Sequence, residues 1–203
     1  MGPHLKLFRA DPHRRIAPVA FRRAYFHGRP GVRHERAARE QKVVSGLRRG
    51  PQRGSAKLQA GPEKWSIAEV AEHIALSESS IFQAAEGAMK PSAREKMADP
   101  GKIDEKILTA IPNRKIKAAA PEPLRPHHQF KTTAEAIDFF KSARDQHIKY
   151  LSETQDALRE HFFNNPVLGD IDAFQWVLFV SAQTERHVAQ INEVKASVGF
   201  PQQ

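Results

Sequence analysis

The chain has 203 residues, a formal net charge of +9 and no cysteine. The lack of cysteine excludes disulfides, thiolate metal ligands and a cysteine nucleophile. The length fits one domain of ordinary size with an extension, or at most two small domains. No apolar run approaches the roughly 18 residues of a membrane span.

The positive charge belongs to the first 60 residues, which hold 15 Lys and Arg against 3 Asp and Glu, whereas residues 61–203 hold 17 and 20. The basic segment has scattered Gly and Pro and little helical apolar periodicity. Such a composition buries too little apolar surface to offset the entropy of ordering the chain. We therefore expect residues 1–57 to form a disordered basic arm, with a weak helix over residues 34–47.

Two alternatives stay open for this arm. It could tether the protein to nucleic acid or another acidic surface, although nucleic acid is the less favoured partner because aromatic and basic residues do not interleave. The abrupt change of composition near Lys57 could also mark a displaced reading frame or start site. The longest apolar stretch of the arm, residues 16–21, is too short for a secretory signal. We expect a cytoplasmic protein without a membrane partner.

After the arm the pattern predicts helices. The first begins at the capping box Ser66-x-x-Glu69, with Trp65 and Val70 in the positions of a hydrophobic staple, and runs to about Met89. Its inner side carries apolar residues at three- and four-residue spacing, namely Ile67, Val70, Ile74, Ile81 and Phe82.

Residues 91–130 hold six prolines, which predict an irregular crossover with a short helix over residues 103–110. A second capping box, Thr132-x-x-Glu135, opens a helix over about residues 134–161. Residues 164–169 are predicted to form a turn, and no strand pattern competes with the helices.

The last helix begins at the cap Asp172-x-x-Gln175 and ends before residue 199. Its buried stripe consists of Val177, Val180, Thr184, His187, Ile191 and Val194. Gln183 lies four residues before His187 and so shares its face. An imidazole in an apolar interface needs a partner, because an unpaired buried polar group costs about 1–3 kcal/mol. A metal ion is one such partner.

Among the other histidines, His73 lies close to the apolar positions of the first helix. Two histidines on neighbouring antiparallel helices can reach one Zn²⁺ or Ni²⁺. The alternative for either residue is a core histidine with an ordinary hydrogen bond, which is the interpretation we favour for His147. We expect His127 and His128 to be exposed in the crossover, and His161 to lie at the end of its helix.

Two stretches resemble the DinB-like (DinB/YfiT) superfamily: WSIAEVAEHIALSES at residues 65–79 and QWVLFVSAQTERHVAQINEVK at residues 175–195. The resemblance covers about residues 61–203. It implies an all-α four-helix bundle with a long crossover, which places the bundle domain at residues 58–203. It also implies a divalent metal held by a His on the second helix and a His-x-x-x-His motif on the fourth. The metal ligands carried over in this way are His73, Gln183 and His187.

This sequence departs from the family pattern at two places. Gln183 stands where the family usually has His, and an amide oxygen is a weaker ligand than imidazole for Zn²⁺ or Ni²⁺. The site is therefore expected to bind metal weakly, or not at all. The first helix of the bundle is also uncertain: either residues 34–47 supply it or the bundle is incomplete.

The resemblance implies a metal-dependent hydrolase or a small-thiol transferase, acting on a small molecule such as a low-molecular-weight thiol. The competing hypothesis is a non-enzymatic helical bundle with a degraded metal site, and a third is nucleic-acid binding by the arm. Glu72, Glu185 and Gln190 would at most surround the ligands, and the favoured alternative for all three is a solvent-exposed surface position. No catalytic base is identified. A homodimer is a further expectation.

Overall fold

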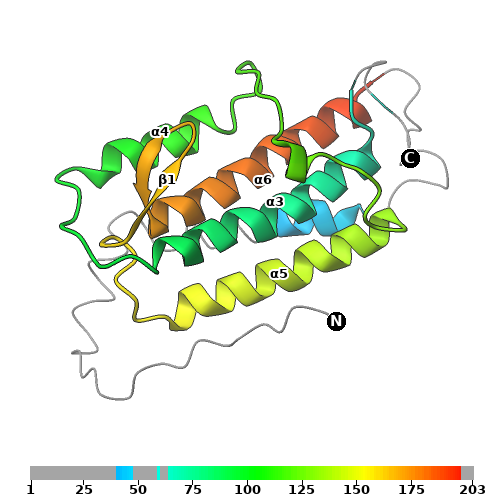
Figure 1. The fold of residues 1–203 in the computed structure, drawn as a ribbon. Coiled ribbons are helices and arrows are strands. Elements are labelled where there is room, and N and C mark those ends of the chain that lie inside the picture. Colours follow the sequence, from blue (N-terminus) through cyan, green and yellow to red (C-terminus); the bar gives the residue numbers. More distant parts are fainter. Residues whose placement is uncertain (1–39, 48–58, 60–63, 198–203) are drawn as a thin grey trace. The chain divides into compact units, whose positions relative to one another are not determined.

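The elements follow the predicted order of helices, with one addition. The computed structural model describes residues 40–47, 59 and 64–197. Its elements are the helices α3 (Ile67–Ala88), α4 (Pro100–Ala110), α5 (Thr133–Glu153) and α6 (Ala173–Lys195), the 3-10 helix η2 (Glu122–Leu124), and the strands β1 (Phe162–Asn165) and β2 (Gly169–Asp172) (Figure 1). Residues 40–46 are also helical. The prediction of a helical fold is thus confirmed.

Reciprocal side-chain caps fix where α3 and α6 begin. The Ser66 hydroxyl accepts a hydrogen bond from the backbone N–H of Glu69, and the Glu69 carboxylate accepts one from the Ser66 N–H. Asp172 and Gln175 form the same reciprocal pair at α6. These bonds satisfy backbone donors that have no partner within a helix. The box predicted at Thr132 is formed only in part: the Thr132 hydroxyl accepts a hydrogen bond from the Glu135 N–H, but the Glu135 carboxylate accepts one from the N–H of Lys131.

α5 ends earlier than predicted, at Glu153 rather than near residue 161. Thr154 leaves the helix in an extended conformation. The Asp156 carboxylate then accepts hydrogen bonds from the hydroxyls of Thr154 and Tyr150, which closes the turn. The end of the helix was mispredicted because Leu158 continues the apolar spacing of α5. Leu158 is indeed buried, but it lies in the loop that follows the helix.

The strands β1 and β2 form an antiparallel hairpin where the sequence predicted only a turn. The expectation that no strand is present was therefore wrong. Both strands are four residues long, which is too short for a visible period-two alternation. The hairpin packs against α3 and α6 and leads directly into the N-terminus of α6.

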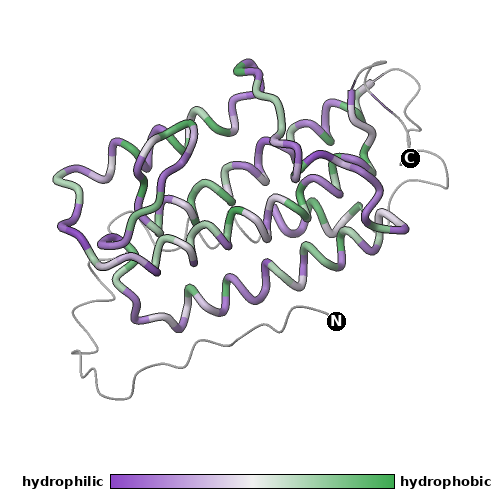
Figure 2. Tube along the Cα trace, viewed as in Figure 1, coloured by the Kyte–Doolittle hydropathy of each residue, from purple (hydrophilic) through white to green (hydrophobic). Residues whose placement is uncertain are grey.

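α3 is the central element, because it contacts both α5 and α6 while α4 packs on the other side of α6 (Figure 1). The chain direction reverses between α3 and α6. Figure 2 shows apolar residues recurring between polar ones along the helices. The main core consists of Val44, Leu47, Ile67, Val70, Ala71, Ile74, Ala75, Ala136, Ile137, Phe140, Ile191 and Val194.

Residues 40–47 contribute to this core from within the predicted arm. Val44 is 0% exposed and Leu47 is 5% exposed, and both pack in the same cluster as α3, α5 and α6. All described residues fall within one compact unit, Ala37–Gln203. The domain that was expected to begin at residue 58 therefore draws part of its core from before that boundary. The rest of residues 1–57, namely 1–39 and 48–57, lies outside the described residues.

Arg144 on α5 is the centre of a buried ionic cluster. Its guanidinium donates to the Glu78 carboxylate of α3 at 2.8 and 2.7 Å, and to the Glu40 carboxylate at 3.3 Å. It also donates to the Thr184 hydroxyl of α6 at 2.9 Å. All four residues are buried. One side chain thus connects α3, α5, α6 and the helical residues 40–46.

The charges in this cluster are maintained by their neighbours. Burial alone would raise the pKa of the Glu78 carboxyl, but the charge of Arg144, together with hydrogen bonds from His147 and Arg144, holds that pKa below its ordinary value. The pKa of Arg144 is raised despite burial, because Glu78 and Glu40 lie beside it. Glu78 and Arg144 are therefore both ionised over the neutral range.

Within the described ranges, no helix combines the length and the apolar character that crossing a lipid bilayer would need.

We expect Arg144→Met to lower the free energy of unfolding by about 3–5 kcal/mol, because it removes the positive charge beside two buried carboxylates. Urea denaturation followed by circular dichroism measures this change. The matched control is Arg94→Met, since Arg94 pairs with Asp170 at an exposed position and such a pair contributes less than about 1 kcal/mol. Equal stability of the two variants would contradict the prediction.

Candidate metal centre

His73 lies on the inner face of α3 and is 1% exposed. Its Nδ1 lies 2.6 Å from the backbone oxygen of Leu124. A carbonyl oxygen only accepts hydrogen bonds, so Nδ1 carries the proton. Burial lowers the pKa of His73, against the opposing effect of this hydrogen bond. The ring is therefore neutral at pH 7 and its Nε2 presents a lone pair.

The crossover is held in place for this contact by Glu72. The buried Glu72 carboxylate accepts hydrogen bonds from the backbone N–H groups of His127, His128 and Gln129 at 2.9 to 3.2 Å. His128 has a φ of 62°, a conformation that a residue other than glycine adopts rarely. Glu72 was expected on the solvent-exposed surface or at most near the metal ligands, but it is buried and its carboxylate anchors the loop that carries Leu124.

His187 on α6 faces His73, and their Nε2 atoms are 3.0 Å apart. The Nδ1 of His187 lies 2.9 Å from the Gln190 side-chain oxygen. Burial, with a further contribution from the neighbouring His73, lowers the pKa of His187 to about 3. Both imidazoles are neutral, and each has its Nδ1 bound to an acceptor.

Gln183 completes the group that the sequence predicted. Its side-chain Nε2 lies 3.2 Å from the Nε2 of His187. A half-turn of the amide would present its oxygen there instead, because the two ends of an amide have nearly the same shape. The structure therefore places the side chains of His73, Gln183 and His187 next to one another, the three residues that the resemblance implies as ligands.

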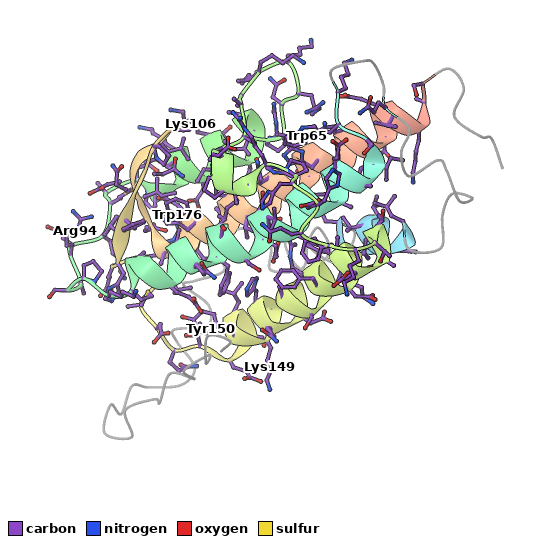
Figure 3. All side chains as sticks on the ribbon, turned by 45° about the vertical axis from the view of Figure 1, so that its right-hand side comes forward. Trp65, Arg94, Lys106, Lys149, Tyr150 and Trp176 are labelled. Carbon is purple, nitrogen blue, oxygen red and sulfur yellow. The ribbon has the colours of Figure 1, made fainter. Side chains whose placement is uncertain are left out.

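Trp65 and Ser77 flank the three residues and were not predicted as part of the site. The Trp65 ring centroid lies 4.9 Å from that of His73 and 6.4 Å from that of His187, near the start of α3 where Figure 3 labels it. The Ser77 hydroxyl lies 3.4 Å from the Nε2 of His73. Ser77 follows His73 by four residues, so helical spacing could have identified it.

The other histidines lie elsewhere. His147 stacks on Phe82, with ring centroids 3.6 Å apart, and its Nδ1 is 2.8 Å from the Glu78 carboxylate. It is thus the hydrogen-bonded interface histidine that the sequence favours. The Nδ1 of His161 contacts the backbone oxygen of Pro91. His127 and His128 are exposed, as predicted.

The donor set fits a divalent cation of intermediate softness. Two imidazole nitrogens on one tetrahedral Zn²⁺, each about 2.0–2.1 Å from it, are about 3.3 Å apart. The 3.0 Å between the facing nitrogens of His73 and His187 needs only a small adjustment. In the part of the chain that the structure describes, no group of three or more His, Cys, Asp or Glu is arranged to hold a metal. The third protein ligand would have to be the Gln183 amide.

The same residues also form a network that needs no metal. The Gln183 NH₂ can donate to the Nε2 of His187, and the Ser77 hydroxyl can donate to the Nε2 of His73. The departure from the family pattern thus gives His187 a partner within the protein.

Comparison with known proteins gives two matches. The sequence profile that describes the DinB superfamily matches residues 22–191. The match includes all three candidate ligands and begins inside the segment predicted as an arm. The protein of Bacillus subtilis (strain 168) named "Uncharacterized protein YuaE" is 28% identical over 136 residues, which cover 67% of this chain and 80% of YuaE.

The lowered pKa of His187 predicts a pH dependence of stability. In the unfolded chain His187 takes up a proton near its ordinary pKa of 6.5, and in the folded protein only near about 3. Between these values the unfolded state binds more protons, so the free energy of unfolding falls as the pH falls. We expect the slope between pH 6.5 and pH 4.5 to be smaller in His187→Gln than in the parent, measured by urea denaturation with a chelator. Equal slopes would contradict the assignment.

Proposed function

This chain belongs to the DinB superfamily, and we propose that it binds a divalent metal, Zn²⁺ or Ni²⁺, through His73, Gln183 and His187. The observation that carries the proposal is the pair of Nε2 atoms 3.0 Å apart. Each belongs to a buried, neutral ring whose Nδ1 is already bound to an acceptor. Two facing lone pairs repel each other unless a positive centre or a donor lies between them.

We propose that the protein, with the divalent metal bound, acts as a metal-dependent hydrolase or as a transferase of a small thiol. A divalent metal with three protein ligands supplies a Lewis acid that lowers the pKa of a bound water or thiol. The protein's own residues prepare the site. The backbone oxygen of Leu124 and the side chain of Gln190 orient the two rings, and Trp65 covers them with an apolar surface.

The burial of the two histidines favours a small-molecule substrate over a polymer. His73 is 1% and His187 is 6% exposed, so a reacting group must enter between α3, α6 and the crossover. The Ser77 hydroxyl beside His73 can hold a proton of a substrate group, because a hydroxyl both donates and accepts hydrogen bonds. A low-molecular-weight thiol would meet these requirements. A cytoplasmic location, where such thiols are reduced, agrees with this proposal.

The second candidate function is a helical binding module with a degraded metal site. It is favoured by one observation, the contact between the Gln183 NH₂ and the Nε2 of His187. In that arrangement the amide takes the place that a metal would have as the partner of the lone pair. The chain would then keep the fold and the two histidines without the ion.

Zn²⁺ titration of the full chain by calorimetry tests the first proposal. We expect one ion per chain, and loss of this binding in His73→Ala and His187→Ala, because each removes a ligand. His127→Ala is the matched control, since His127 is exposed in the crossover. No stoichiometric binding, or binding unchanged in His187→Ala, would contradict a site at these residues.

Gln183→His distinguishes the two functions. Imidazole is the better ligand for Zn²⁺, so we expect it to tighten binding by about tenfold or more, which corresponds to ~1.4 kcal/mol. A parent protein that binds no Zn²⁺, with binding gained in Gln183→His, would establish the degraded site. Failure of Gln183→His to change the affinity would exclude position 183 as a ligand.

A further inference from the structure

Arg114 lies in the crossover and reaches His187 through Gln190, on the Nδ1 side of the ring rather than the Nε2 side that faces His73. Its guanidinium donates to both carboxylate oxygens of Glu193 on α6, at 3.1 and 2.9 Å. This two-bond contact fixes the plane and the direction of the guanidinium. Its Nη1 then donates to the side-chain oxygen of Gln190 at 3.3 Å. Arg114 is one-quarter exposed at its side chain.

The contact with Arg114 decides which end of the Gln190 amide faces His187. A guanidinium has donors and no acceptor, so the atom of Gln190 that it approaches has to be the oxygen. The same oxygen lies 2.9 Å from the Nδ1 of His187. That nitrogen must then donate, and a neutral imidazole with its proton on Nδ1 has a lone pair on Nε2.

A second arrangement of the same atoms competes with this one. If the Gln190 amide turned over, its NH₂ would face His187 and would require a lone pair on Nδ1. The ring proton would move to Nε2, from which it could donate to the Nε2 of His73, 3.0 Å away. The two histidines would then be hydrogen-bonded to each other, and neither Nε2 atom would have a lone pair free to bind an ion.

Arg114 disfavours this second arrangement, because its N–H groups would face the NH₂ of the turned amide. His73 needs no such control. Its Nδ1 binds the backbone oxygen of Leu124, and a backbone carbonyl cannot be exchanged for a donor. Of the two rings, the one whose tautomer depends on a side chain from another segment is therefore His187, through Gln190 and Arg114.

We propose that Arg114 is a positioning residue that holds the Gln190 amide in one orientation and thereby keeps the ring proton of His187 on Nδ1, with Nε2 directed at His73. The effect on metal affinity rests on the proposed function. The tautomer itself is a property of the metal-free protein and can be measured without it.

The first test compares the metal-free parent with Arg114→Met at pH 8, in the full chain. Long-range ¹H–¹⁵N correlation spectra distinguish the two tautomers of each histidine. We expect the proton of His187 on Nδ1 in the parent, and its transfer wholly or partly to Nε2 in Arg114→Met. Arg94→Met, which removes an exposed ion pair, should leave the spectrum of His187 unchanged. An unchanged tautomer in Arg114→Met would overturn the proposal.

The second test is a rescue. A carboxylate at position 190 has acceptors on both oxygens and cannot turn a donor toward His187. Arg114→Met combined with Gln190→Glu should therefore return the proton to Nδ1. We expect the Zn²⁺ affinity to fall by about 10- to 100-fold in Arg114→Met, as for other residues that orient a metal ligand, and to recover in the double variant.

The outcomes separate this proposal from the proposed function. A parent that binds no Zn²⁺ contradicts the function, and the spectra still decide the role of Arg114. Affinity lost in Arg114→Met with the tautomer unchanged shows a structural effect and overturns the proposal. If Arg114→Met does not fold, Gln190→Met removes the same acceptor from Nδ1, and an unchanged tautomer in that variant has the same consequence.

Discussion

The buried ionic cluster at Arg144 is the constraint on which the rest of the structure depends. A guanidinium that binds two oxygens of one carboxylate tolerates little sliding, because each N–H needs its own acceptor. Arg144 holds Glu78 of α3 and Thr184 of α6 at the same level. His73 comes five residues before Glu78, and His187 three residues after Thr184. Since the two helices run in opposite directions, this level brings the two histidines face to face.

A slip of one turn would move one helix by about 5.4 Å and separate the two Nε2 atoms. Apolar packing alone specifies the register less sharply than these hydrogen bonds, because the hydrophobic effect is not directional. Glu40 ties the helical residues 40–46 into the same cluster. The helical segment that precedes α3 in the sequence is therefore coupled to the register of the helices that carry the candidate ligands.

The crossover supplies the second constraint, and it acts through polar contacts. The Glu72 carboxylate accepts hydrogen bonds from three backbone N–H groups, those of residues 127–129. The Arg186 guanidinium donates to the backbone oxygens of Ile111, Asn113 and Ile116, where α4 ends. The irregular stretch is thus fastened at both ends to the two helices that hold the histidines, which lets its own atoms orient their rings.

The sequence predicted those features that depend on neighbours along the chain. The caps at Ser66 and Asp172 and the apolar stripe of α3 are local patterns, and the pairing of Gln183 with His187 follows from helical spacing. The partners of Arg144 and the role of Arg114 could not be predicted, because they join residues far apart in the sequence. The helix that carries Val44 and Leu47 was predicted only as a weak one, because few apolar residues stand out from the basic composition around them.

The two histidines differ in how easily chance mutation can disturb them. The ring of His73 is oriented by a main-chain oxygen, which every residue type at position 124 would provide. The ring of His187 depends on the side chains of Gln190 and Arg114, and each can be lost through one nucleotide change. Under relaxed selection, the α6 half of the site would therefore decay before the α3 half. Gln183, the position that departs from the family pattern, belongs to the α6 half.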